Sequence, residues 1–114
     1  VKAEFNTVIE NLTGWVLNSQ DYAIPQRRKR VILIGSKINN FKIIPPEPKT
    51  SNENTDLFST LKNWVSVEDA LSDLPPINQG ENGSHLTYIS SPRTNYQRLM
   101  RGEISPSEYL ADFT

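Results

Sequence analysis

The sequence predicts an α/β chain in which an amphipathic helix and an antiparallel strand pair precede loops and short helices. The segment Glu4–Leu12 repeats apolar residues at the i, i+3, i+4, i+7 spacing of a helix. The run Val31–Ile34 is mostly β-branched and is closed by Gly35, which is typical of a buried strand. Ten residues without a helix signal connect the strands expected at 15–19 and 30–35. A parallel crossover needs about a dozen residues or more, so we expect these strands to be antiparallel.

The first third of the chain is predicted to place cations at the start of a strand. We expect Thr13-Gly14 to end the first helix, with Gly14 in the positive-φ region that glycine tolerates. A strand then begins at Trp15. Four consecutive cations, Arg27 to Arg30, lead into the second strand. Cations held by a rigid strand can bind an anion or a polarised carbonyl group.

The remainder of the chain is predicted to contain a linker and short helices. We divide the sequence into residues 1–36, a polar, proline-rich linker at 37–64, and a helical and loop segment at 65–114. Three signals place the helices of the last segment: a Ser66/Asp69 capping box before a helix at 67–73, Gly102 after a helix at 93–101, and the sequence Ser105-Pro106-Ser107-Glu108 at the start of another.

Composition limits the chemistry of the chain. The formal net charge is −1, so any attraction to nucleic acid must come from a local patch of cations. The chain contains no cysteine, which excludes disulfides, thiolate metal sites and a cysteine nucleophile within it. No apolar run is long enough to span a membrane. Because Val1 stands where an initiator methionine would be and neither terminus resembles a natural end, we expect a piece of a longer protein.

Several blocks of the sequence together match the motif order of one family. Pro25–Val31 resembles a Gln-x-Arg-x-Arg signature, and Leu17–Pro25 resembles the Leu-Asn-Ala-x-Asp-Tyr-Gly-Val-Pro segment before it. Val65–Pro76 and Tyr96–Gly102 are similar to segments that follow in many members, in the same order. Together these blocks resemble the cytosine-5 DNA methyltransferases, in which the Gln-x-Arg-x-Arg signature is known as motif eight. Ala23 departs from the pattern, which usually has glycine there. If that position needs a positive φ, alanine costs roughly 1 kcal/mol.

The resemblance implies an incomplete piece of a Rossmann-like, S-adenosylmethionine-dependent methyltransferase domain. In this family a cysteine from a Pro-Cys motif attacks a cytosine that is flipped out of double-stranded DNA. The chain lacks that motif, the glycine-rich loop that binds S-adenosylmethionine and the Glu-Asn-Val motif. We therefore expect the parent to be a DNA (cytosine-5-)methyltransferase, while the piece itself is inactive and binds neither cofactor nor metal. A bacterial restriction–modification system, in the cytoplasm near the nucleoid, is the expected setting.

The resemblance also assigns roles to the basic residues. Arg30 would contact the carbonyl oxygen of the flipped cytosine, where charge develops when the thiolate adds to the ring. Arg28 would support Arg30 or bind a neighbouring phosphate, because residues two apart on an extended chain share a face. Arg27 and Lys29 would contact DNA phosphate or solvent from the other face. Gln26 would order the loop and complete the DNA-binding set.

Structural explanations compete with these functional ones. Four cations in a row are most often a solvated face, and sometimes a nuclear-localisation signal, when no flanking motif accompanies them. Other side chains are interpreted structurally: a surface position for His85, a helix cap and an exposed face for Asp69 and Asp73, core positions for Trp15 and Trp64, and packing or surface charge rather than DNA contact for Tyr96, Arg98 and Arg101.

A second functional hypothesis belongs to another class. The chain could be a non-catalytic nucleic-acid-binding or adaptor module that shares the scaffold, and it would then bind DNA on its own with a steep dependence on salt. Under either hypothesis a half-sheet exposes apolar edges, so we expect that the isolated chain can form a non-native dimer.

Overall fold

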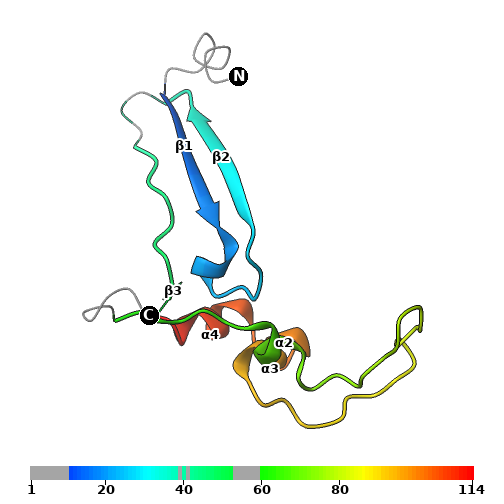
Figure 1. Cartoon of the computed structure of the whole chain (residues 1–114). Helices are drawn as coiled ribbons and strands as arrows, with labels where there is room; N and C mark the ends of the chain where they lie inside the picture. Colours follow the sequence, from blue (N-terminus) through cyan, green and yellow to red (C-terminus); the bar gives the residue numbers. More distant parts are fainter. Residues whose placement is uncertain (1–10, 39, 41, 53–59) are drawn as a thin grey trace.

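The computed structural model describes residues 11–38, 40, 42–52 and 60–114. A β-hairpin stands on one side of a layer of short helices, and a long loop extends away from that layer (Figure 1). The radius of gyration is 19.0 Å, against about 13 Å for a compact domain of this length. The chain is therefore extended, and its elements contact one another mainly within the hairpin and among the short helices.

The hairpin consists of β1 (Asn11–Asn18) and β2 (Lys29–Ser36), which pair antiparallel in a two-stranded sheet. The predicted antiparallel arrangement is confirmed, although both strands start earlier than expected. Ser19 was expected to end the first strand, but it begins the 3-10 helix η1 (Ser19–Tyr22). This short helix lies in the connection between the two strands and helps to reverse the direction of the chain. The connection is too short for a parallel crossover.

The prediction of an N-terminal helix is wrong for the last two residues of that helix. Residues 4–10 of the predicted helix lie outside the described part of the chain, but Asn11 and Leu12 belong to β1. Gly14 does not end a helix, and among the described glycines only Gly80 and Gly102 have positive φ. Gly14 pairs with Leu33, and a Cβ on Gly14 would lie 2.5 Å from Leu33 Cδ2. The glycine thus allows close cross-strand packing.

The prediction that the second strand is buried is also wrong. Val31 is 68% exposed, and the three apolar residues after it are also exposed. In the described part of the chain this strand belongs to a sheet of two strands, so much of its surface is left open. The β-branched composition therefore identifies the strand but not its burial. Trp15 is half-buried, whereas Trp64, the other predicted core tryptophan, is 36% exposed and donates its indole N–H to Asp21 Oδ1 at 3.1 Å.

The segment predicted as a polar linker contains two short strands. These are β3 (Thr50–Ser51) and β4 (Lys62–Asn63), which pair parallel. Before β3 the chain runs back beside the hairpin towards the helices (Figure 1). It is fixed to η1, because Lys49 N–H donates to Asp21 O at 2.8 Å and Tyr22 Oη donates to Pro46 O at 3.0 Å. The division of the chain into three segments stays a prediction.

The helices follow the predicted capping signals closely. They are α2 (Val67–Leu71), α3 (Asn95–Met100) and α4 (Pro106–Ala111). Capping boxes at Ser66/Asp69 and Ser105/Glu108 are both formed. Gly102 follows α3 with φ of 72°. However, α2 ends two residues before the predicted 73, and α3 begins two residues after the predicted 93 because Thr94 is its N-cap.

The exposed valines of the hairpin predict self-association of the isolated chain. Val16 and Val31 are paired across the strands and are 66% and 68% exposed. Exposed apolar pairs on an uncovered sheet favour contact with another such surface. We expect sedimentation velocity to show concentration-dependent dimers, weakened about tenfold by Val16→Thr with Val31→Thr.

Val67→Thr is the matched control for that prediction, because Val67 is 61% exposed on α2 and away from the hairpin. We expect this variant to associate like the parent chain. A monomer at every concentration, or equal weakening by Val67→Thr, would contradict association through the hairpin.

Candidate functional site

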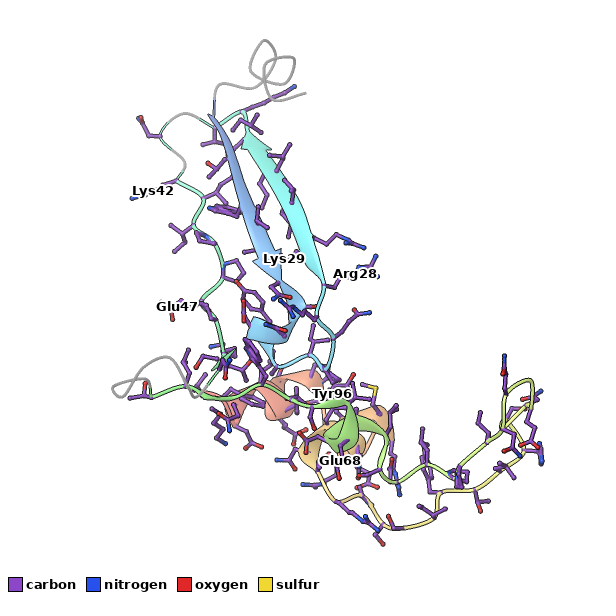
Figure 2. All side chains as sticks on the ribbon, viewed as in Figure 1. Arg28, Lys29, Lys42, Glu47, Glu68 and Tyr96 are labelled. Carbon is purple, nitrogen blue, oxygen red and sulfur yellow. The ribbon has the colours of Figure 1, made fainter. Side chains whose placement is uncertain are left out.

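The basic segment, residues 26–30, lies where the chain enters β2 and approaches the helical layer. Gln26, Arg27, Arg28, Lys29 and Arg30 are all exposed. Figure 2 places Arg28 and Lys29 at the end of the hairpin nearest the helices. Within the described ranges, no carboxylate forms an ion pair with any of these cations. The segment is therefore a local cationic surface on a chain whose net charge is close to neutral.

Asn18 and Ser19 fix the backbone of the basic segment from the opposite side of the loop. Asn18 Oδ1 accepts a hydrogen bond from Arg28 N–H at 3.1 Å, and Ser19 N–H donates to Arg28 O at 3.0 Å. Ser19 Oγ donates to Gln26 O at 2.6 Å. These bonds extend cross-strand pairing beyond the last paired residues, Asn18 and Lys29. The Gln26 N–H also donates to Ile24 O at 2.7 Å. The loop-ordering role of Gln26 stays a prediction.

Arg30 is the first arginine within the regular part of the strand. It pairs with Leu17 across the hairpin. Because side chains alternate along a strand, Arg30 and Ile32 share a face. Arg30 Nη1 donates to its neighbour's carbonyl, Lys29 O, at 2.8 Å. A guanidinium has five N–H donors, so this single bond leaves most of the fork available for an anion or a carbonyl oxygen. That the side chains of Arg28 and Arg30 point to the same face stays a prediction.

Ala23 is the point where the loop before the basic segment attaches to the rest of the chain. It is fully buried and has φ of 60° and ψ of 30°. Its N–H donates to Thr50 Oγ1 at 3.2 Å, and its carbonyl accepts from Tyr109 Oη at 2.7 Å. The position thus does require the left-handed conformation, which costs alanine about 1 kcal/mol relative to glycine. Hydrogen bonds at both backbone groups maintain that conformation.

Tyr109 joins α4 to this loop. Its side chain is 4% exposed and lies edge-on to Tyr96 and Phe113, with ring centroids 5.8 and 5.2 Å away. Burial, reinforced by the nearby Tyr96, Asp69 and Asp112, raises the pKa of Tyr109 to about 12. The hydroxyl is therefore protonated at neutral pH and can donate to the Ala23 carbonyl.

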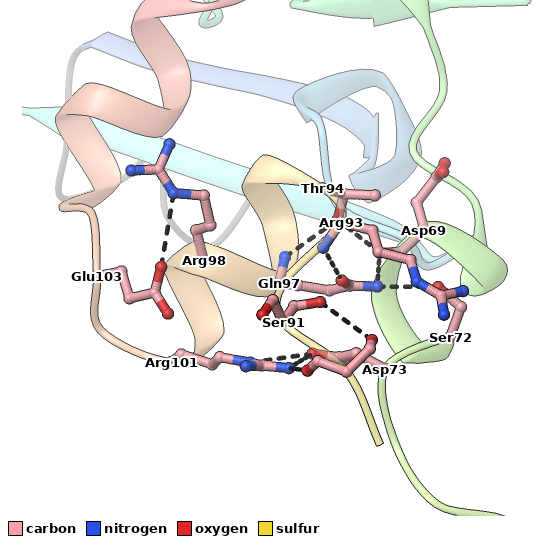
Figure 3. A network of polar contacts seen from close by, with 11 residues as sticks. Asp69, Ser72, Asp73, Ser91, Arg93, Thr94, Gln97, Arg98, Arg101 and Glu103 are labelled. Atoms are coloured by element: carbon pink, nitrogen blue, oxygen red, sulfur yellow. Dashed lines mark hydrogen bonds and ion pairs between the residues drawn. The ribbon is translucent and has the colours of Figure 1, made fainter. Parts of the chain in front are cut away.

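A buried ion pair holds the long loop and the helices together (Figure 3). Arg101 Nη2 lies 2.6 Å from Asp73 Oδ2, and the two side chains are 13% and 3% exposed. Arg101 also donates to Ser90 O at 2.8 Å and lies 3.7 Å from the centroid of the Tyr88 ring. The exposed position predicted for Asp73 is wrong, because the chain turns after α2 and carries this carboxylate inward. Asp69 caps α2 as predicted.

The predicted structural roles of the α3 residues agree with their contacts. Arg101 is committed to the buried pair, while Arg98 forms an exposed ion pair with Glu103 at 3.6 Å. Tyr96 is half-buried against Tyr109. Gln97, which carries no predicted role, is 1% exposed and donates to Asp69 O and Ser72 Oγ, each at 3.0 Å. His85 is exposed in the loop, as predicted.

Sequence reasoning missed the two side chains that hold Ala23. Thr50 lies in a segment that reads as a polar linker, and Tyr109 is one of several aromatic residues near the C-terminal end. The departure from glycine at position 23 was the one visible signal that the loop geometry needed support. No local pattern indicates which residues provide it, because they lie 27 and 86 positions away.

Membrane-spanning helices and metal-binding groups are both absent from the described residues. No helix among them is long and apolar enough to cross a membrane. Across the same ranges, no three His, Asp or Glu side chains gather into a possible metal-binding group.

Comparison with known proteins identifies the family. A family model for C-5 cytosine-specific DNA methylases matches residues 11–110. The chain is 36% identical over 105 residues to the type II methyltransferase M.DdeI of Desulfomicrobium norvegicum, covering 89% of this chain and 23% of that protein. It is 32% identical over 100 residues to the type II methyltransferase M.AgeI of Thalassovita gelatinovora, covering 75% and 23%.

The similarity extends to a eukaryotic protein. The chain is 25% identical over 108 residues to the DNA (cytosine-5)-methyltransferase PliMCI of Paracentrotus lividus, covering 79% of this chain and 7% of that protein. No solved structure matches the chain significantly. The chain spans about a quarter of the length of the two bacterial relatives. The family match nevertheless extends over most of its residues, and the chain belongs to the C-5 cytosine-specific DNA methylase family.

Proposed function

We propose that this chain is part of a DNA (cytosine-5-)methyltransferase that transfers a methyl group from S-adenosylmethionine to carbon five of a cytosine flipped out of double-stranded DNA. The observation that carries the proposal is the family match over residues 11–110, which includes the basic segment and the residues that fix it. The strand pair and short helices would be the last part of a Rossmann-like catalytic domain, followed by the start of its target-recognition region.

The basic segment would supply positive charge at the target base. When a thiolate adds to the cytosine ring, negative charge develops on the ring and its carbonyl oxygen. A guanidinium placed at that oxygen stabilises the transition state more than the ground state. Arg30 is the residue we assign to this role, with Arg28 in support and Gln26, Arg27 and Lys29 as further DNA contacts. Their exposure and the absence of ion pairs within the described ranges support this assignment.

The cofactor would be bound by other parts of the parent protein. The groove beside Ala23 has a volume of about 760 Å³, and Glu47 and Lys49 are the charged side chains in its mainly apolar lining. It lacks the glycine-rich turn that holds S-adenosylmethionine in this family, so the residues present do not fit that group. The attacking cysteine must also come from elsewhere, because this chain has none. The chain alone would therefore be catalytically inactive.

The bacterial type II relatives favour a restriction–modification system as the setting. In such a system the enzyme would act on chromosomal DNA, so its proposed location is the cytoplasm, at the nucleoid. Methylation there would protect the host's own recognition sites from cleavage.

Methyl transfer by the full-length protein tests the proposed function. Labelled S-adenosylmethionine and double-stranded DNA are incubated with the full-length protein and, separately, with the isolated chain. We expect 5-methylcytosine with the full-length protein and none with the chain alone. If the full-length protein transfers no methyl group while the isolated chain binds DNA, the chain is instead a non-catalytic binding module on the same scaffold.

A further inference from the structure

Residue 23 is held through its backbone by two segments that are distant in the sequence. Thr50 on β3 accepts a hydrogen bond from its N–H at 3.2 Å, and Tyr109 on α4 donates one to its carbonyl at 2.7 Å. Thr50 Oγ1 also donates to Gln20 O at 2.6 Å, so a single hydroxyl connects both ends of η1. Thr50 is 1% exposed and Tyr109 is 4% exposed, so water does not compete strongly for these bonds.

We propose that the Thr50 and Tyr109 hydroxyls are positioning groups for methyl transfer, which act through the backbone of Ala23 to set the place of Arg30. The proposal rests on the function proposed above. Both hydroxyls remain outside the reacting groups, and neither contacts the basic segment directly. Their effect passes along the loop from Ala23 through Ile24 and Pro25 to residues 26–28, which Ser19 holds from the other side.

The backbone conformation of Ala23 makes these hydroxyls necessary. An alanine in the left-handed region is higher in energy by about 1 kcal/mol than one in the ordinary regions. Two hydrogen bonds, each contributing about 1 kcal/mol, offset that cost. Without them the loop can relax at residue 23, and a change in φ there redirects the chain that leads to Pro25. Catalytic groups must be held within about 0.5 Å of their productive place, so a small redirection lowers the rate.

The packing around Tyr109 separates the role of its hydroxyl from that of its ring. The ring is held by edge-on contacts to Tyr96 and Phe113. Tyr109→Phe keeps these contacts and removes only the hydrogen bond to Ala23 O. Thr50→Val likewise keeps the shape of the side chain and removes a hydroxyl, and Thr50→Ser keeps the hydroxyl. The two sites thus offer independent tests of one connection.

The decisive experiment is a double-mutant cycle in the full-length protein. Single-turnover methyl transfer is measured for Tyr109→Phe and Thr50→Val, each alone and combined with Arg30→Ala. We expect each hydroxyl deletion to lower the rate about tenfold when Arg30 is present and less than twofold when it is absent. Thr50→Ser should recover at least half of the rate that Thr50→Val loses, on a logarithmic scale. Tyr88→Phe, which removes the hydroxyl of a half-exposed tyrosine in the long loop, should match the parent.

The cycle distinguishes positioning from general support of the fold. A purely structural role lowers the active fraction equally in both backgrounds, and distant independent sites give additive effects. A tenfold loss with and without Arg30, or no loss in either, would overturn the proposal while leaving the methyltransferase assignment intact. An inactive full-length parent would instead overturn the proposed function, and this inference with it.

Discussion

Replacing Arg30 with alanine in the full-length protein is expected to lower the rate of methyl transfer by about 100-fold or more. The guanidinium would face negative charge that exists only once the thiolate has added, so its removal affects kcat more than substrate binding. Arg30→Lys should recover part of the loss, because an ammonium group keeps the charge but lacks the planar fork. Single-turnover kinetics at saturating DNA measures the effect on the chemical step directly.

Arg27→Ala is the control for a cation in the same segment with a different role. It is expected to weaken DNA binding and to reduce the salt dependence of binding, while the single-turnover rate at saturating DNA stays within about threefold of the parent. Equal rates for Arg30→Ala and the parent enzyme would refute the assignment of Arg30 to the base carbonyl. The family assignment would remain, because it depends on the match over residues 11–110.

Removal of the Asp73 carboxylate is expected to cause the largest loss of stability. Breaking a buried pair by deleting one partner typically costs about 3–5 kcal/mol, since the remaining charge is left in a place that water reaches poorly. In Asp73→Ala that charge is the Arg101 guanidinium, whose side chain is 13% exposed. A chain of this size has a total stability of about 5–15 kcal/mol, so the variant should lose a large share of it and unfold at a clearly lower urea concentration.

The ion pair between Arg98 and Glu103 provides the comparison. Its side chains are 46% and 43% exposed, and pairs of this kind contribute little. Urea unfolding, followed by tryptophan fluorescence, should show less than about 0.5 kcal/mol of change for Glu103→Gln. Asp73→Ala combined with Arg101→Met should be more stable than Asp73→Ala alone, because the unpaired charge is gone. Similar midpoints for Asp73→Ala and Glu103→Gln would show that the buried pair does not hold the loop.

The features that the sequence predicts correctly are those set within a few residues. The capping boxes depend on a serine and an acidic residue three positions apart, and the antiparallel strand pair depends on the short connection between two apolar runs. The end of α3 depends on a glycine that can adopt positive φ. Local rules of this kind require only that the chain interacts with its immediate neighbours.

The features that the sequence does not predict depend on distant partners. Asp73 is buried because Arg101 lies 28 residues later and reaches it. Glycine after an apolar helical pattern is typical of a helix end, yet Gly14 lies within a strand, where it pairs with Leu33 and leaves room for that side chain. The basic segment is visible from the sequence, whereas the contacts that hold Ala23 come from separate parts of the chain. A polar linker pattern could not indicate that Thr50 would be buried.

The hydrogen bonds that hold the basic segment have one more consequence, for how its sequence can vary. Within the basic segment they end on main-chain atoms: the carbonyl of Gln26, and the N–H and carbonyl of Arg28. Any residue except proline presents the same main-chain atoms. Side chains at positions 27 and 29 can therefore be diversified in a library without dismantling the loop, while Asn18 and Ser19 must stay fixed. The end of the hairpin therefore combines variable side chains with a backbone conformation that stays the same.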